Sequence, residues 1–224
     1  MNLPLPIRIA GLLSLLGLGL ISTGCHSIPL AGAFAGEEYR PENVYSSATN
    51  LPPNLKRVAV LPLIARARQA ELKDACESLD PLVTAALLKT QKFEVTRISE
   101  ADSKTITGQS TWTGEEELPE NFFAALNKSS GCDAVFFCQL TTFRGYAPLA
   151  IGWRMKLVDV HSRQILWAGD EVFDAGQNNV KNGAQRYQAA HIRAVENGDW
   201  AMENSPCYFG QYTLAKLLDT LPAR

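Results

Sequence analysis

The sequence predicts an α/β (α+β) domain with a mixed five-stranded sheet and covering helices, in the order strand-helix-strand-helix-strand-strand-strand-helix-helix. Three observations support this prediction. A continuous apolar run at residues 57–63 is typical of a strand buried on both faces. A stretch with helical spacing follows it directly. From residue 134 onward, three strand-like segments precede two further helical segments.

The first half of the domain alternates between strands and helices. Apolar residues recur at helical spacing over 72–87, and Asp80 and Pro81 interrupt them. Because Asp is a good N-cap and Pro a good first helical residue, one kinked helix and two shorter helices both fit this stretch. The next predicted elements are a strand, a short helix with a surface loop, and a second helix, at residues 93–98, 99–117 and 118–131.

Three strands and two helices fill the second half. Apolar residues alternate from Ile151 to Leu157, which is the period of a strand. A turn at 159–163 joins that strand to the next as a hairpin, and Ser205 with Pro206 predicts the start of the last helix. The predicted elements are strands at 134–143, 151–157 and 164–173, and helices at 183–196 and from 206 onward.

The chain begins with the three parts of an export signal. Arg8 supplies a positive charge, an apolar run of 13 residues follows at 9–21, and small residues precede Cys25. A helix needs about 20 apolar residues to span a bilayer, so the run is too short. The segment resembles a bacterial lipoprotein signal, which implies that residues 1–24 are a signal peptide and that Cys25 carries acyl chains such as palmitate. The alternative is an ordinary cleavable signal with a coincidental cysteine.

The residues after Cys25 predict where and how the domain is held. In the lipoproteins that this signal resembles, Asp after the lipidated cysteine retains the protein in the inner membrane. His26 stands there instead, which implies the periplasmic side of the outer membrane, with the inner membrane as the alternative. Residues 25–53 are rich in Gly, Ala, Pro, Ser and Asn without a period, so we expect a lipid-anchored flexible linker. Tyr39 and Tyr45 are expected to be exposed, with docking back on the domain as the alternative. Residues 54–224 suffice for a single α/β domain with C-terminal helices.

Charge and cysteine content limit the partners and cofactors. The chain has 21 basic and 23 acidic side chains, a formal net charge of −2, whereas a nucleic-acid-binding domain is basic. Cys132 and Cys138 lead into one predicted strand, about 20 Å apart, and a disulfide needs Cα atoms within about 7 Å. Buried free thiols are the favoured interpretation, with pairings of Cys76 or Cys207 left open. No cysteine or histidine spacing fits zinc, and no cofactor is expected.

No catalytic constellation stands out. The three histidines, His26, His161 and His191, fall in the linker, in a hairpin turn and on a helix face. We expect His161 to be solvated and His191 to be partly buried with its hydrogen bonds satisfied. The sequence contains no Gly-rich phosphate loop, nucleophile elbow or H-E-x-x-H helix. The acidic run 115–117 reads as a solvated loop near a helix N-terminus. We therefore assign no catalytic residue and predict a protein that is not an enzyme.

Exposed aromatic residues are the candidate binding sites. Trp112 lies in a loop with little core pattern, and Tyr146 lies at the tip of a strand connection. Aromatic anchors dominate many protein contacts, so we predict that both bind a partner. The alternative for Trp112 is that it folds over the domain edge. Trp200 is expected to pack as a lid between the last two helices.

Several strand and turn segments carry a family resemblance. The α/β domain of the curli-secretion lipoprotein group resembles this chain in four segments: Arg57-Val58-Ala59-Val60-Leu61-Pro62-Leu63, Lys92-Phe93-Glu94-Val95 after a helix, Gly131-Cys132-Asp133-Ala134-Val135, and the hairpin from Leu157-Val158-Asp159 to Ile165-Leu166-Trp167. The layout is also similar to the N-terminal domain of the Tol-Pal β-propeller protein and to lipoproteins that activate penicillin-binding proteins. The resemblance covers about residues 55–175, concerns structural positions, and carries no binding residue over.

These observations predict a non-enzymatic, lipid-anchored envelope protein that acts as a periplasmic binding or assembly module. Its expected partners are the membrane, through the lipid on Cys25, and another envelope protein, but not nucleic acid. One alternative is a small-ligand-binding or hydrolytic periplasmic domain that uses a groove between the strand ends and the loop at 99–117. The other is a subunit of an export assembly.

Overall fold

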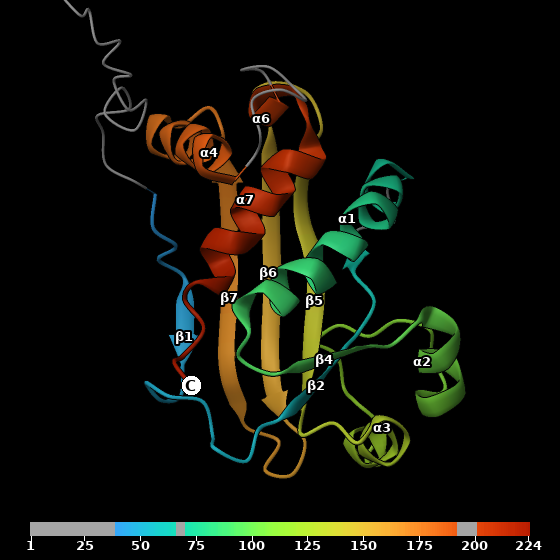
Figure 1. Cartoon of the computed structure of the whole chain (residues 1–224). Helices are drawn as coiled ribbons and strands as arrows, with labels where there is room; N and C mark the ends of the chain where they lie inside the picture. The colour runs from blue at the N-terminus through green and yellow to red at the C-terminus, as the bar shows by residue number, and fades with distance from the viewer. Residues whose placement is uncertain (1–38, 66–69, 192–200) are drawn as a thin grey trace, which may run out of the picture.

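The computed structural model describes residues 39–65, 70–191 and 201–224. The predicted signal peptide, Cys25, His26 and Trp200 lie outside the described residues. Within them the chain forms a mixed sheet with helices on both faces, which confirms the predicted fold class (Figure 1). The described elements in chain order are β1 (Val44–Ser46), β2 (Arg57–Val60), β3 (Ile64–Ala65), α1 (Ala70–Thr90), β4 (Glu94–Arg97), α2 (Glu100–Thr107), α3 (Phe122–Ser130), β5 (Ala134–Arg144), β6 (Ala150–Asp159), β7 (Ile165–Asp174), α4 (Asn178–His191), α6 (Ala201–Asn204) and α7 (Pro206–Leu218).

The sheet combines a parallel half with an antiparallel half. Its strand order is β1-β7-β6-β5-β2-β4, and β3 pairs with the far part of β5. β2 runs parallel to both β4 and β5, whereas β5, β6 and β7 form an antiparallel meander. The described residues form seven strands rather than the predicted five, because β1 and β3 are too short, at three and two residues, to show a period.

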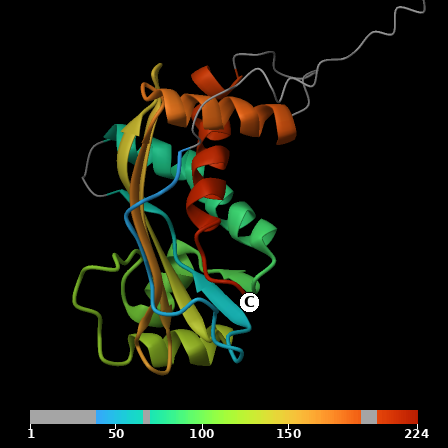
Figure 2. The same ribbon diagram turned by 90° about the vertical axis from the view of Figure 1, so that its left-hand side faces the viewer.

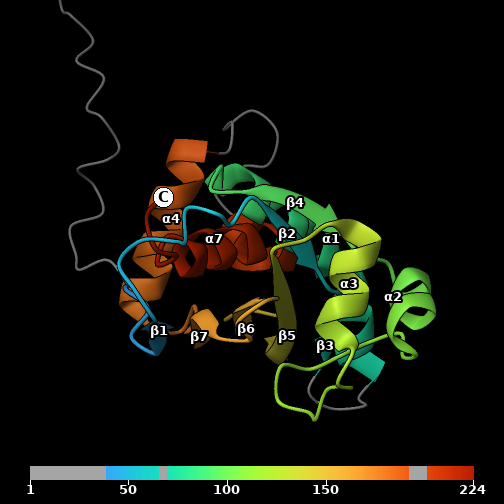
Figure 3. The ribbon, with the colours of Figure 1, turned by 90° about the horizontal axis from the view of Figure 1, so that it is seen from below.

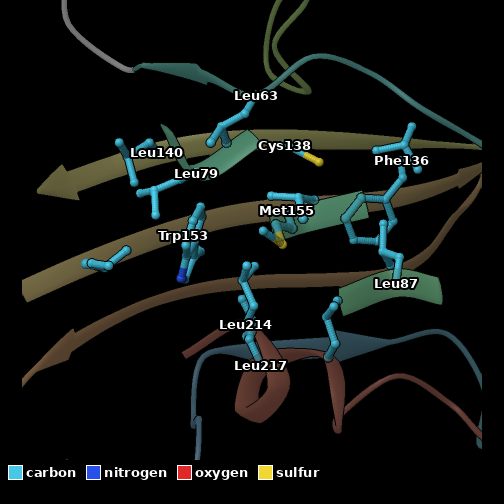
Figure 4. Close-up of a cluster of buried hydrophobic side chains, with 14 of the residues drawn as sticks. Leu63, Leu79, Leu87, Phe136, Cys138, Leu140, Trp153, Met155, Leu214 and Leu217 are labelled. Atoms are coloured by element: carbon cyan, nitrogen blue, oxygen red, sulfur yellow. The ribbon is translucent and has the colours of Figure 1, made fainter. Parts of the chain in front are cut away.

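Two hydrophobic clusters lie on opposite faces of this sheet. The larger one joins α1, α4 and α7 to one face, and Trp153 and Met155 from β6 lie at its centre (Figures 3 and 4). The smaller one packs α3 and the loop before it on the parallel half, through Trp112 and Phe122. This arrangement follows from the chain path, because the connection from β2 to β4 and the connection from β4 to β5 cross opposite faces.

The predicted linker is wrong in its second half. β1 pairs antiparallel with β7, and the Leu51 amide donates to the Ala223 carbonyl at 2.7 Å. Tyr39, expected to be exposed, instead packs its ring on Phe173 with centroids 5.1 Å apart. Only Tyr45 is exposed as expected. The strap, which we define as residues 39–53, therefore belongs to the folded domain.

Asp80 explains which helix pattern the chain adopts. α1 is a single helix that includes Pro81, so Asp80 does not cap a second helix. Its carboxylate instead accepts a hydrogen bond from the Leu63 amide at 2.8 Å and pairs with Arg97. A tertiary contact thus replaces the local capping role that the sequence suggested.

The structure also shows the state of the described cysteines and the start of α4. Cys76, Cys132 and Cys138 are buried free thiols, as favoured from the sequence, but the free thiol of Cys207 is exposed. α4 begins at Asn178, five residues earlier than predicted. No helix in the described ranges has the length and apolar character needed to cross a bilayer.

Candidate functional site

A pocket of about 640 Å³ opens where β2 and β4 end, between α1 and the start of α2. The carboxyl ends of parallel strands are a common place for ligand sites in α/β sheets. This is also where the sequence predicted a groove beside the 99–117 loop. The residues that line it come from the segment after β2, from α1, and from the β4–α2 region with its following loop: Pro62, Leu63, Ile64, Ala65, Lys73, Cys76, Glu77, Asp80, Pro81, Arg97, Ser99, Glu100 and Thr111.

The inner wall of the pocket is apolar. Leu63 and Cys76 are buried, and they belong to the larger hydrophobic cluster. Figure 4 shows Leu63 beside this cluster, near Leu79 and Cys138. The β3 residues Ile64 and Ala65 are half-buried and add apolar surface. An apolar group of a ligand would therefore contact a surface that is packed on the hydrophobic core.

Asp80 is a strongly bound carboxylate in the wall of the pocket. It accepts the Leu63 amide at 2.8 Å and pairs with the Arg97 guanidinium, so it links α1, β4 and the segment after β2. Arg97 remains half-exposed, and the ion pair therefore has solvent on one side. Because both Asp80 oxygens have donors, this carboxylate is placed to hold the pocket together rather than to remove a proton.

The Cys76 thiol also lines the pocket. Burial, helped by the nearby Asp80 and Glu77 carboxylates, raises its pKa to about 12. A thiol is nucleophilic as the thiolate, so Cys76 stays protonated and unreactive near neutral pH. Its contribution to the pocket is that of a small apolar side chain.

Charged groups form the rim. Lys73 and Glu77 lie one helical turn apart on α1, and Glu100 lies in the first turn of α2. Ser99 caps α2, since its hydroxyl accepts the Asp102 amide at 3.1 Å. The pocket thus combines an apolar wall with charges of both signs, which suits an amphipathic ligand. Within the described ranges, no group of three or more His, Cys, Asp or Glu side chains could hold a metal ion.

Trp112 does not form part of an exposed site. Its side chain is only 2% exposed, its Nε1 donates to the Thr107 hydroxyl at 2.6 Å, and its ring meets Phe122 edge-on at 5.1 Å. The prediction of a partner-binding Trp112 is therefore wrong, and the alternative that it folds over the domain edge is correct. The neighbouring Thr111 lines the pocket.

Tyr146, unlike Trp112, lies on the surface. It is 74% exposed in the short turn between β5 and β6. Its place on the surface fits the prediction, and its binding role stays a prediction. It does not line the pocket, so the two predicted aromatic sites do not come together.

His161 is solvated, as expected, whereas His191, which was expected to be partly buried, is exposed. His161 is exposed in the β6–β7 turn, where its amide donates to Asp159 at 2.9 Å. His191 is exposed at the end of α4, with Nδ1 3.1 Å from the Tyr187 carbonyl and its ring stacked on Tyr187 at 4.3 Å. Neither residue lines the pocket.

Sequence reasoning missed the ion pairs of Arg154. Its guanidinium bonds Asp170 at 2.7 Å and Glu115 at 2.6 Å, and the bond to Asp170 is the main cause that raises the pKa of Arg154. Glu115 is thus paired rather than simply solvated. The alternation around Trp153 was the available signal, because it places Arg154 on the opposite face of the sheet.

Comparisons with known proteins add a fold likeness. No family model matches the chain, and no characterised protein matches its sequence. Among solved structures it is similar to the PelC dodecamer from Paraburkholderia phytofirmans, with 16% identity over 81% of this chain and 96% of that chain, and a TM-score of 0.47.

Two lipoprotein structures are also similar. Lipoprotein GNA1162 from Neisseria meningitidis has 20% identity over 55% of this chain and 83% of that chain, with a TM-score of 0.36. The LpoB C-terminal domain from Escherichia coli has 18% identity over 57% of this chain and 86% of that chain, with a TM-score of 0.36. These scores are too low to support an argument about function, and the resemblance to the curli-secretion group and the Tol-Pal protein stays a prediction.

Proposed function

We propose that the chain is a lipid-anchored, non-enzymatic binding module of the bacterial envelope, and that its pocket holds a segment of another envelope protein. The observation that carries this proposal is the pocket at the ends of β2 and β4, with its apolar wall and its rim of mixed charge. Anchoring through Cys25 on the periplasmic side of the outer membrane completes the proposal, with the inner membrane as the alternative location.

The polar groups of the pocket favour binding over catalysis. Asp80 is occupied by the Leu63 amide and by Arg97, and Cys76 is held as a neutral thiol. A general base must be placed to take a proton from a substrate, and a cysteine nucleophile acts as the thiolate. The Asp80 carboxylate is engaged by structural donors instead, and the Cys76 thiol stays protonated.

The shape of the α1 wall favours an extended peptide. The lining residues of α1 run from Lys73 to Pro81, a rise of about 12 Å. This length matches three or four residues of extended chain at about 3.3 Å each. Lys73, Glu77 and Glu100 can pair with charges along such a segment, while its apolar side chains meet Leu63 and Ile64.

A charge reversal on the rim tests the pocket. Glu100→Lys should reduce recovery of the crosslinked envelope partner about tenfold, because one lost charge contact of about 1.4 kcal/mol changes binding by that factor. The matched control is Glu120→Lys, an exposed glutamate before α3 that does not line the pocket. Equal recovery with both variants, at unchanged melting temperature, would refute the pocket as the partner site.

A second candidate function is small-molecule binding, which the pocket volume favours. About 640 Å³ lies within the range of roughly 300–1,000 Å³ that is usual for ligand pockets. A small ligand should raise the melting temperature of the purified domain, and Ala65→Phe, which fills the pocket, should abolish that rise. A peptide partner predicts crosslinks to one protein instead.

The anchor has its own test. Cys25→Ser should move the protein from the membrane fraction to the soluble periplasmic fraction. Persistence in the membrane fraction would show that another contact holds it there and would remove the lipid anchor from the proposal.

A further inference from the structure

Hydrogen bonds show where the tether, which we define as residues 26–38 between Cys25 and the strap, joins the domain. The Tyr39 hydroxyl donates to Glu171 at 2.6 Å, and the amides of Glu42 and Asn43 donate to the other oxygen of Glu171 at 2.8 and 3.2 Å. The Tyr39 ring also packs edge-on against Phe173. One carboxylate of β7 thus binds three donors of the strap, and the preceding chain must leave the domain near the C-terminal half of β7.

The turn between β5 and β6 lies at this same end of the sheet. Ala150, which begins β6, pairs with Asp174, which ends β7, and Arg144 forms an ion pair with Asp174 at 2.7 Å. Figures 1 and 2 show this turn at the upper end of the sheet, with the strap running down beside β7. The tip, which we define as residues 145–149, contains no charged side chain and exposes Tyr146.

The strap shortens the tether. With residues 39–53 bound to the sheet, 13 residues, 26–38, separate Cys25 from Tyr39. Thirteen residues can reach about 45 Å at most. Glu171, which binds the strap, lies three residues or about 10 Å from Asp174 at the tip end of β7, but six residues or about 20 Å from Ile165 at the other end. The tether therefore favours an orientation in which the tip faces the membrane.

We propose that the tip rests on the lipid surface that holds Cys25, with Tyr146 in the headgroup layer. The inference builds on the lipid anchor of the proposed function. Tyrosine suits this position because its ring is apolar and its hydroxyl can bond to headgroups and water. The absence of charge from residues 145–149 removes the desolvation cost that a charged tip would carry at the interface.

This orientation also places the pocket. Ala65 pairs with Leu140 on β5, four residues before the end of that strand at Arg144, a rise of about 13 Å. The pocket lies next to β3, toward the β4 edge of the sheet, whereas the strap lies at the opposite edge, next to β7. A tip at the membrane thus holds the pocket close to the bilayer and leaves its opening clear of the tether. It suits a partner segment that emerges near the membrane surface.

Fluorescence quenching in vesicles tests the contact. The lipidated chain with Tyr146→Trp is reconstituted into phosphatidylcholine vesicles whose acyl chains carry bromine, which quenches indoles in contact with the lipid. The matched control is Ile165→Trp, at the opposite end of β7, where the native side chain is 38% exposed. Emission of the unsubstituted chain is subtracted from both, and melting temperatures confirm that both variants fold.

The expected result is loss of most of the added emission for Tyr146→Trp and little loss for Ile165→Trp. Equal quenching of the two, or none at position 146, would overturn the proposed orientation. Flotation with the vesicles is measured first, and a chain that does not float contradicts the lipid anchor instead. In that case the variants, with Cys207→Ser added, are coupled through Cys25 to a maleimide lipid, and the same quenching comparison tests the tip directly.

Discussion

The loop that carries Trp112 buries its aromatic side chain, whereas the turn that carries Tyr146 leaves its aromatic side chain exposed. The loop folds back over the parallel half of the sheet and buries Trp112 against Phe122. The turn joins two adjacent strands, and its Tyr146 is 74% exposed. In this domain the connection that crosses a sheet face buries its aromatic residue. The connection that only reverses the chain at the end of the sheet exposes its aromatic residue.

Trp112→Ala should have the largest effect on stability. The indole is almost fully buried, and removing a buried Trp or Phe costs about 3–5 kcal/mol. Urea unfolding followed by circular dichroism measures this loss. A cost below about 1 kcal/mol would contradict the packing of the loop on the sheet.

Thr107→Val tests the polar contact of the same indole. The substitution keeps the shape of the side chain but removes the acceptor of the Trp112 Nε1–H, whose bond is 2.6 Å long. Leaving this buried donor without a partner should cost about 1–3 kcal/mol. Urea unfolding of Thr105→Val provides the comparison, because the Thr105 hydroxyl is exposed and bonds only within α2.

The pH dependence of stability tests the pocket wall beside the loop. Because the pKa of Cys76 rises from 9.0 to about 12 on folding, its neutral form stabilises the fold fully below pH 9. That contribution is lost as the pH rises toward 12, since the unfolded thiol ionises first. The free energy of unfolding of the native chain should therefore fall more between pH 8 and pH 11 than that of Cys76→Ala. Parallel decline of the two chains would show that the thiol is not buried.

Glu115→Ala should have a small effect that depends on salt. Glu115 is half-exposed and pairs with Arg154, and surface pairs of this kind contribute about 0–1 kcal/mol. Hydrogen exchange at residues 113–117 should become faster, and the stability difference from the native chain should vanish near 1 M salt. A loss that persists in high salt would mean that Glu115 supports the loop through packing.

Tyr146→Ala should leave stability unchanged within about 0.5 kcal/mol, because an exposed tip has little to lose. Urea unfolding checks this, and it makes the contrast with Trp112→Ala explicit. A loss of about 2 kcal/mol or more would show that the turn packs on the domain and would remove Tyr146 as an exposed contact.

Local sequence patterns predicted the elements that are long enough to show a period. β5, β6 and β7 span 10 or 11 residues each, and α1 contains more than five turns, so their patterns are clear. β1 has three residues and depends on Glu171, which is more than 120 residues away in the chain. Contacts at such separation leave no local pattern.

The candidate site was predictable in place but not in detail. The length of the 99–117 loop indicated a groove between it and the strand ends, as an alternative to the aromatic sites, and the pocket lies there. Asp80 looked like a helix cap because Pro81 follows it, although its partners come from β4 and from Leu63. Trp112 looked exposed because its loop has no period, whereas burial came from α3, which packs beside it.

Site-specific photocrosslinking in intact cells tests the central claim most directly. A benzophenone amino acid replaces Lys73 on the pocket rim, and a matched chain carries it at Glu120, outside the pocket. The account predicts a crosslink from position 73 to one envelope protein, and loss of that crosslink when Ala65→Phe fills the pocket. Crosslinks of equal yield from both positions, or a yield from position 73 that Ala65→Phe leaves unchanged, would contradict a binding role for the pocket.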